Sequence, residues 1–268
     1  MDSAKDAATV PVAGGEGLSL SRDGDVLVLT LDEPGRRNPV GHAVRQTLAA
    51  RLAEAASDPA VAAVVLTGAG GHFSAGGDIR DQETVTSVAQ ARERFTHVKT
   101  LVGRMARFPK PLVAAVEGWA AGGGFSLALA CETVVAADTA RFAASFGKIG
   151  LIPDLGLLAT LPARIGAGRA QRIFLACATV GAEEGHRLVF VDALVPEGGA
   201  LAAATRIARE AAAMAPLPRA FVKDFMAAEL DRALDFERLV QPVLMLGADA
   251  AEGRRAFLEK RAPVFRGA

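Results

Sequence analysis

The sequence predicts an α/β fold built on a parallel sheet, followed by a helical C-terminal region. Two runs of apolar and largely small or β-branched residues, 60–67 and 112–116, have the composition of strands that are buried on both faces. Each run is followed by a glycine-rich loop and then by a helical segment, and strands that alternate with helices in this way form parallel sheets. From residue 166 onward the spacing of apolar residues is mostly helical.

The first 195 residues are expected to hold the sheet. A leader up to about Gly17 looks disordered, and the alternating DVLVLTL (25–31) predicts the first strand, which PGRRNP (34–39) ends. The remaining elements are predicted from the spacing of apolar residues and from turn residues. In order, they are a helix at 40–56, a strand at 60–67, a helix at 88–107, a strand at 112–116, a small-residue helix at 125–130, a strand at 133–137 and a strand-like break at 188–195.

The C-terminal part is expected to be a series of helices. Their expected bounds are 201–214, 218–228, 234–246 and 249–260. We therefore divide the chain into a flexible leader (1–17), a β-rich core (18–195) and a helical region (196–268).

Length and charge limit the classes of function. The chain has 268 residues, and its 30 lysines and arginines balance its 30 aspartates and glutamates, so it lacks the excess positive charge of a general nucleic-acid binder. A local pair of arginines is still enough to bind a small anionic ligand.

Signals for export, membranes and metals are weak or missing. The N-terminal residues lack the apolar core of a signal peptide, and no uncharged apolar run reaches the roughly 18 residues of a membrane span. Cys131 and Cys177 are too few for a disulfide framework, and the four histidines and two cysteines show no metal-ligand spacing. We expect a cytoplasmic protein without a metal, a membrane partner or a nucleic-acid partner.

The glycine loops predict an oxyanion-binding site. Many of the 28 glycines gather in two places, Gly68–Gly77 and Gly122–Gly124, each after an expected buried strand. Glycine lets another molecule approach the backbone closely, and N–H groups at the start of a helix attract negative charge. One such loop is more often an ordinary turn. Two of them indicate a pair of N–H donors that converge on one oxygen.

Five segments resemble the crotonase (enoyl-CoA hydratase/isomerase) superfamily. They occur in family order from about residue 18 to the C-terminus and read RRNPV (36–40), VVLTGAGGHFSAGGDI (64–79), PLVAAVEGWAAGGGFSLALACE (111–132), FGKIGLIPDLG (146–156) and AFLEKRAPVF (256–265). The resemblance implies the crotonase-like (ClpP/crotonase) fold of repeated ββα units, which form two roughly perpendicular sheets. It also implies a C-terminal helical region that builds a homotrimer or homohexamer.

The same resemblance implies a coenzyme A thioester as substrate and a role in fatty acid or other lipid metabolism. By position, the backbone N–H groups of Ala75 and Gly123 would hold the thioester oxygen. The other candidate contacts with substrate or coenzyme A either flank these two positions, occupy places that match the family motifs, or carry a positive charge that could bind phosphate. They are Arg36, Arg37, Gly76, Gly77, Asp78, Ile79, Gly122, Ser126, Phe146 and Lys260. The two arginines read equally well as a solvated pair in a turn, and Asp78 as a helix cap.

The sequence departs from the hydratase pattern at two positions. Hydratases of the family use two glutamates, and in register with the motifs these positions hold Ser126 and Phe146. Neither side chain can deprotonate the water that adds across a double bond. We therefore expect efficient hydration to be absent, and we interpret the nearby Glu117 and Glu132 as structural.

Asp154 is the acid that remains well placed. LIPDLG (151–156) resembles the loop of superfamily members that use an aspartate here, such as ring-opening epoxyphenylacetyl-CoA isomerases and some dehalogenases. The apolar neighbours Ile152 and Leu155 are expected to raise the pKa of the Asp154 carboxyl, as a general base needs. A turn or helix-cap role for this aspartate stays open.

One carboxylate beside an oxyanion hole suits a proton shuttle. We expect an enoyl-CoA double-bond isomerase that needs no cofactor beyond the coenzyme A of its substrate. Other coenzyme A ester chemistry on the same site (a lyase, a hydrolase or a dehalogenase) and a non-catalytic binder stay open. A serine peptidase with Ser126 as nucleophile is a distant alternative, because none of the four histidines, of which His72 is nearest in the motif, is marked as its base.

Overall fold

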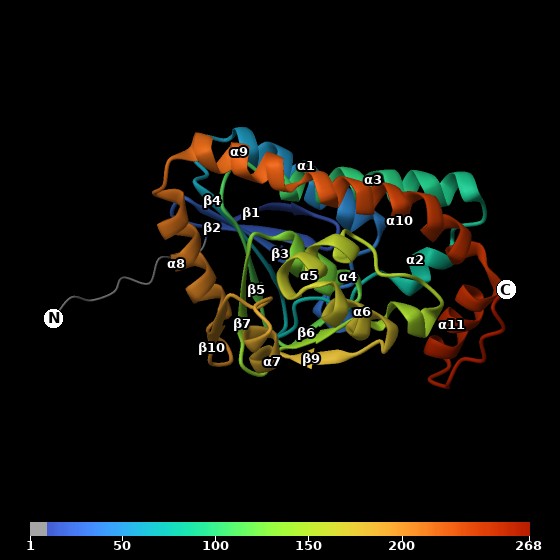
Figure 1. The fold of residues 1–268 in the computed structure, drawn as a ribbon. Coiled ribbons are helices and arrows are strands. Elements are labelled where there is room, and N and C mark those ends of the chain that lie inside the picture. Colours follow the sequence, from blue (N-terminus) through green and yellow to red (C-terminus); the bar gives the residue numbers. More distant parts are fainter. Residues whose placement is uncertain (1–9) are drawn as a thin grey trace.

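A computed structural model describes residues 10–268, and it contains two sheets (Figure 1). The larger sheet has seven strands in the order β1-β2-β3-β4-β5-β7-β10, and the smaller has three in the order β6-β8-β9. The strands are β1 Val10–Gly15, β2 Leu18–Asp23, β3 Val26–Leu31, β4 Ala63–Gly68, β5 Leu112–Val116, β6 Trp119–Ala121, β7 Thr133–Ala137, β8 Arg141–Ala143, β9 Thr179–Gly181 and β10 Ala193–Val195.

The parallel part of the large sheet is the part that the sequence predicts. Strand β3 pairs with β4, β4 with β5, β5 with β7 and β7 with β10, all in parallel. Along β4 and β5, alternate residues face opposite sides of the sheet. Leu66 and Ala114, for example, join the main core, whereas Val65 and Val113 join a second cluster with α8. Because both faces are covered, these strands are apolar apart from Thr67, whose hydroxyl donates to Ala115 O at 3.0 Å.

The predicted leader is corrected at its C-terminal end. Residues 10–15 form β1, which pairs antiparallel with β2, and a turn at Glu16 and Gly17 joins them. The proline and glycines of this segment, VPVAGG, have low strand propensity, so only its pairing with β2 makes it a strand. The rest of the predicted leader, residues 1–9, lies outside the described residues.

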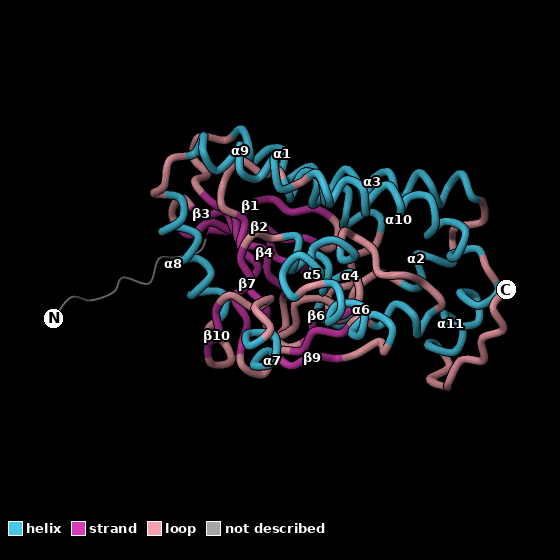
Figure 2. Tube along the Cα trace, viewed as in Figure 1, coloured by secondary structure: helices cyan, strands magenta, loops and turns pink. Residues whose placement is uncertain are grey.

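The helices cover both faces of the large sheet (Figures 1 and 2). They are α1 His42–Ser57, α2 Ile79–Glu83, α3 Val88–Ala106, α4 Gly123–Ala130, α5 Leu157–Ile165, α6 Ala167–Leu175, α7 Ala182–Arg187, α8 Ala200–Ala212, α9 Pro216–Met226, α10 Ala228–Leu246 and α11 Ala248–Leu258, with short 3₁₀ turns η1 Pro34–Arg36 and η2 Ser145–Ile149. Alanines of α8 lie flat on one face, and α1, α3 and α4 pack on the other. Helix α10 packs along α3.

The helical C-terminal region has the predicted number and order of helices, with different bounds. Helix α10 begins at Ala228 rather than at residue 234, and the strand-like break at 188–195 contains only the three residues of β10. The first part of this segment is not a strand because Leu188 is the C-cap residue of α7 and Val189 has a left-handed φ of 66°. No helix within residues 10–268 is both long and apolar enough to cross a bilayer.

Candidate active site

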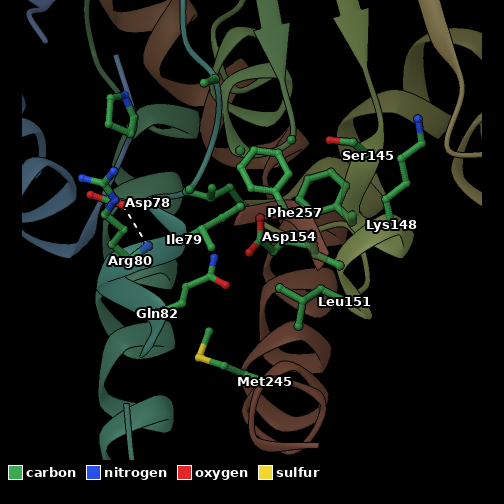
Figure 3. Close-up of a pocket in the computed structure, with 18 of the residues that line it drawn as sticks. Asp78, Ile79, Arg80, Gln82, Ser145, Lys148, Leu151, Asp154, Met245 and Phe257 are labelled. Atoms are coloured by element: carbon green, nitrogen blue, oxygen red, sulfur yellow. Dashed lines mark hydrogen bonds between the residues drawn. The ribbon is translucent and has the colours of Figure 1, made fainter. Parts of the chain in front are cut away.

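A cavity of about 330 Å³ lies where the ends of β4 and β5 meet the C-terminal helices (Figure 3). It is lined by Arg36, Pro39, Arg45, Ala75, Gly77, Asp78, Ile79, Arg80, Gln82, Arg94, Phe95, Gly122, Gly123, Ser145, Phe146, Lys148, Ile149, Leu151, Asp154, Leu155, Met245, Phe257 and Leu258. Most of the residues that the sequence singles out are therefore brought together in one place. The last three lining residues belong to α10 and α11, which close the cavity.

The two glycine loops meet at the floor of this cavity. Ser74 forms a bridge with Ala120, in which the Ser74 N–H donates to Trp119 O and the Ala121 N–H donates to Ser74 O, both at 2.9 Å. Gly76 has a φ of 97°, and a Cβ built on it would lie 2.5 Å from Ala121 O. Glycine is required there because the two main chains approach too closely for a side chain.

The structure corrects one of the two predicted oxyanion donors. The Ala75 N–H donates to Arg37 O at 2.7 Å, because residues 37–40 run alongside residues 75–76 as a short parallel bridge. The Gly76 N–H is also engaged, by Ser74 Oγ at 3.0 Å. Ala75 therefore has no N–H to offer a substrate, and the prediction for Ala75 is wrong.

The N–H groups of Gly77 and Gly123 are the pair that is available. Neither has a hydrogen-bond acceptor among residues 10–268, and both residues line the cavity. A Cβ built on Gly123 would lie 3.5 Å from the Gly77 nitrogen, so the two residues are close enough to share one oxygen. Gly123 also begins α4, whose dipole adds positive potential at this point. The arrangement is that of an oxyanion hole.

Asp154 lies on the loop between η2 and α5 and points into the cavity (Figure 3). Removal of the carboxyl from water raises its pKa to about 6, against the opposing charge of Arg45 and a hydrogen bond from Gln241 Nε2 at 3.4 Å. The direction of the shift is the one expected from its apolar neighbours. Of the two that the sequence names, Leu155 is buried and Ile152 is partly buried, and Leu151 is buried as well. A carboxyl with this pKa is mostly ionised at neutral pH and can still accept and return a proton.

Two buried polar residues of α10 hold the Asp154 loop, and sequence reasoning missed both. Gln241 accepts a hydrogen bond from the Ile152 N–H at 3.2 Å and donates to Ile152 O at 2.9 Å. Glu237 accepts from the Gly156 N–H at 3.1 Å. Both side chains are fully buried. A usable signal existed, because they occupy core-facing positions in the same stripe as Leu234 and Met245.

Glu237 is a neutral carboxylic acid at physiological pH. Burial, and to a smaller extent the negative charge of Asp154, together raise its pKa to about 9, although hydrogen bonds from the backbone N–H groups of Gly156 and Leu155 oppose the shift. Two carboxylates so close cannot both ionise at low cost, so Glu237 keeps its proton while Asp154 carries the charge.

Replacement of Glu237 by glutamine is expected to flatten the pH dependence of stability. With a pKa of about 9 in the fold and 4.5 in the unfolded chain, the native state binds an additional proton between these values. The wild type therefore loses stability as pH rises through this window, whereas glutamine keeps the acceptor for the Gly156 N–H and does not ionise. Urea unfolding should show the variant gaining at least about 1 kcal/mol relative to the wild type between about pH 5 and about pH 8. Parallel stability profiles for the two proteins would contradict the assignment.

Four predicted contacts do not line the cavity. Arg37 ends η1 in a left-handed conformation, and Gly76 contributes backbone spacing only. Ser126 is fully buried, with its hydroxyl donating to Gly122 O at 3.3 Å, and Lys260 lies exposed beyond the end of α11. Arg36 does line the cavity, but it is ion-paired with Glu33 and, at 2.9 Å, with Asp78.

The structure also bears on two alternatives from the sequence analysis, namely Asp78 as a helix cap and Ser126 as a peptidase nucleophile. Asp78 accepts the Arg80 N–H and so caps α2, and its other oxygen holds Arg36, which leaves Asp154 as the lining carboxylate without an ion pair. The Ser126 hydroxyl donates to no histidine among residues 10–268, and His72 instead accepts the Trp119 N–H at 3.3 Å. The base that a serine nucleophile needs is therefore not in place.

Comparison with known proteins finds relatives over most of the chain. A family model described as enoyl-CoA hydratase/isomerase matches residues 21–268. A protein named 1,2-epoxyphenylacetyl-CoA isomerase from Escherichia coli (strain K12) is 36% identical over 251 residues, which are 90% of this chain and 95% of the relative.

Solved structures with the same fold are also found. A crystal structure of an enoyl-CoA hydratase from Mycobacterium avium subsp. paratuberculosis K-10 aligns with a TM-score of 0.84 and 33% identity, covering 96% of this chain and 100% of that chain. An enoyl-CoA hydratase/isomerase from Pseudoalteromonas atlantica T6c aligns with a TM-score of 0.83 and 28% identity, covering 93% and 100%.

Proposed function

The chain belongs to the enoyl-CoA hydratase/isomerase family, and from this premise we propose that it shifts the double bond of an enoyl-CoA, with Asp154 as the single acid and base. It has the crotonase fold and is an enzyme of a family that acts on coenzyme A thioesters. The observation that carries the proposal is that Asp154 faces the cavity as a carboxylate with no ion pair in the described part of the chain, residues 10–268, at the same site as the N–H groups of Gly77 and Gly123, which have no acceptor in that part.

In the proposed reaction, one proton moves and nothing else is gained or lost. The Asp154 carboxylate takes a proton from C2, the carbon between the thioester and the double bond of a 3-enoyl-CoA. The electron pair moves to the thioester oxygen, and the N–H groups of Gly77 and Gly123 stabilise the resulting dienolate. The same carboxyl then returns the proton to C4, which gives the 2-enoyl-CoA. The proposed cycle uses neither water nor a cofactor beyond the coenzyme A of the substrate.

Hydration is disfavoured by the side chains around the same cavity. Phe146 lines the wall where a second acid would stand, and Ser126 is buried outside the cavity. Asp154 alone would have to activate a water molecule and also protonate the product. The E. coli relative is named for an isomerase of 1,2-epoxyphenylacetyl-CoA, which makes that compound a second substrate to try.

The remaining expectations accompany this proposal. Of the cations that the sequence names for coenzyme A, Arg36 lines the cavity. Lys148, which is not among those cations, lines it too, and both would contact the phosphates of coenzyme A. Helices α9 and α10 expose a set of large apolar side chains that would be covered in the proposed trimer or hexamer, and these are Leu217, Phe221, Val222, Phe225, Met226, Leu239 and Val243.

The proposal is tested by following 3-hexenoyl-CoA, crotonyl-CoA and 1,2-epoxyphenylacetyl-CoA in heavy water with product analysis. We expect 3-hexenoyl-CoA to give the 2-enoyl product, with deuterium at C4 only to the extent that the Asp154 carboxyl exchanges its proton with the solvent before returning it, and crotonyl-CoA to remain without added water. Hydration of crotonyl-CoA at a rate above the isomerisation would overturn the assignment. A protein that binds the esters without conversion or exchange would be a non-catalytic binder.

A further inference from the structure

Arg45 is a buried cation in the wall of the cavity. It lies in the first turns of α1, beside the core residues Val44 and Leu48, and only 9% of its surface is exposed. The part that is exposed faces the cavity, because Arg45 is one of the lining residues. Arginine is seldom buried to this degree unless a carboxylate or another acceptor is paired with it.

The charge of Arg45 has no such partner. Its Nε donates to Gly41 O at 3.2 Å, and among residues 10–268 no side chain forms an ion pair with its guanidinium or accepts a hydrogen bond from its Nη atoms. Two of the three other arginines that line the cavity differ in this respect, and the third, Arg80, is exposed to solvent. Arg94 is ion-paired with Asp81 at 3.0 Å, and Arg36 with Asp78 at 2.9 Å.

The pKa of Arg45 is consistent with a buried positive charge that has no ion-pair partner. Burial lowers the pKa of the Arg45 guanidinium below its usual range, while the charges of Asp154 and Asp81 act in the opposite direction. An isolated buried charge is unfavourable, so a group with a negative charge would be favoured in this part of the cavity.

A second unsatisfied polar atom lies on the same cavity. Gln82 Oε1 is buried and has no hydrogen-bond partner within the described residues 10–268, and Gln82 follows Asp81, one of the carboxylates that act on Arg45. Figure 3 shows Gln82 pointing into the cavity that Asp154 also faces. The amide of Gln82 can turn its donor group towards a ligand as readily as its acceptor. Arg45 and Gln82 are therefore two residues of this cavity wall with polar atoms that lack a side-chain partner among residues 10–268.

We propose that Arg45 binds a carboxylate on the acyl group, so that the cavity prefers coenzyme A thioesters of dicarboxylic acids to those of simple fatty acids. The planar guanidinium and a carboxylate form two parallel hydrogen bonds. The bound carboxylate neutralises the charge of Arg45 and leaves Asp154 free for proton transfer. This inference rests on the proposed function in one respect, namely that the acyl group occupies this cavity.

The test compares binding of saturated thioesters that have the same chain length and differ in one carboxylate. The pairs are butanoyl-CoA with succinyl-CoA, hexanoyl-CoA with adipoyl-CoA, and octanoyl-CoA with suberoyl-CoA, and calorimetry gives each Kd. Wild type is expected to bind the dicarboxylic member of at least one pair about tenfold more tightly, as a charge-assisted hydrogen-bonded pair allows. In Arg45→Met the ratio of the two Kd values of that pair is expected to fall to about one, and in Arg45→Lys it is expected to be intermediate. Arg51→Met, which removes an arginine of the same helix outside the cavity, keeps the wild-type ratio.

Two outcomes would overturn the inference. One is a wild type that binds the simple fatty ester at least as tightly in all three pairs. The other is an Arg45→Met variant that weakens both members of every pair by the same factor, which would make Arg45 a positioning residue for Asp154. Because the saturated esters cannot isomerise, the measurement stands even if the isomerase assay fails. Isomerisation of 3-hexenoyl-CoA without a preference for dicarboxylic esters would reject only the present inference.

Discussion

Asp154→Asn is expected to lower kcat for double-bond isomerisation by about 10²–10⁴-fold, the range that a positioned general base contributes. Asparagine has nearly the same shape, so the loop contacts of Gln241 with Ile152 and the cavity wall stay in place. It cannot accept a proton from C2 of the substrate. The measurement is the rate of conversion of 3-hexenoyl-CoA, with the Kd of hexanoyl-CoA expected to remain close to that of the wild type.

A pH profile is the internal control for this assignment. Because the base must be ionised, kcat/KM of the wild type should fall as pH drops through about 6, the pKa of Asp154. The residual activity of Asp154→Asn should lack that limb. A variant that keeps more than about half of the wild-type rate, or one that keeps the same acid limb, would remove Asp154 from the mechanism.

Gly123→Ala is expected to lower kcat/KM by about 10²–10³-fold, the effect of losing one oxyanion-hole donor. The added methyl group would lie 3.5 Å from the Gly77 nitrogen and 2.9 Å from Leu155 Cδ1, so it occupies the space between the two N–H groups. The thioester oxygen would then be kept away from both donors. The measurement is again isomerisation of 3-hexenoyl-CoA, together with the melting temperature of the variant.

Gly168→Ala provides the matched control. It makes the same change in α6, where a Cβ would meet no atom within 4 Å, and alanine is the better helix former. This control should keep the wild-type kcat/KM and melt at the same or a slightly higher temperature. If Gly123→Ala melts like the wild type and also keeps its activity, the oxygen is held elsewhere and the assignment to Gly77 and Gly123 fails.

The predictable part of the fold is the part that depends on local pattern. Strands β3, β4, β5 and β7 are revealed by continuous or alternating apolar residues, because both faces or one face of each is buried. The strands of the smaller sheet are three residues long, too short for a period to be read. They are strands because segments as distant as 119–121, 141–143 and 179–181 pair with one another.

The oxyanion hole is likewise only partly predictable from local sequence patterns. The glycine loops and Gly123 are visible in the sequence, since close approach of backbones excludes side chains. Which N–H is free is decided by the bridge between residues 37–40 and 75–76, which uses the Ala75 N–H and leaves that of Gly77. No local sequence pattern shows which of Ala75 and Gly77 keeps its N–H free.

The sequence by itself determined the family, the sheet, the glycine loops and the position of Asp154, because each of these is written in a short contiguous pattern. Only the tertiary structure decided the chemical state of the site. It brings Glu237 and Gln241 onto the Asp154 loop across separations of 81 and 89 residues, and it places Arg45 of α1 in the same cavity. The physical reason is that protonation and charge depend on burial and on neighbours in space, and folding supplies both from distant parts of the chain.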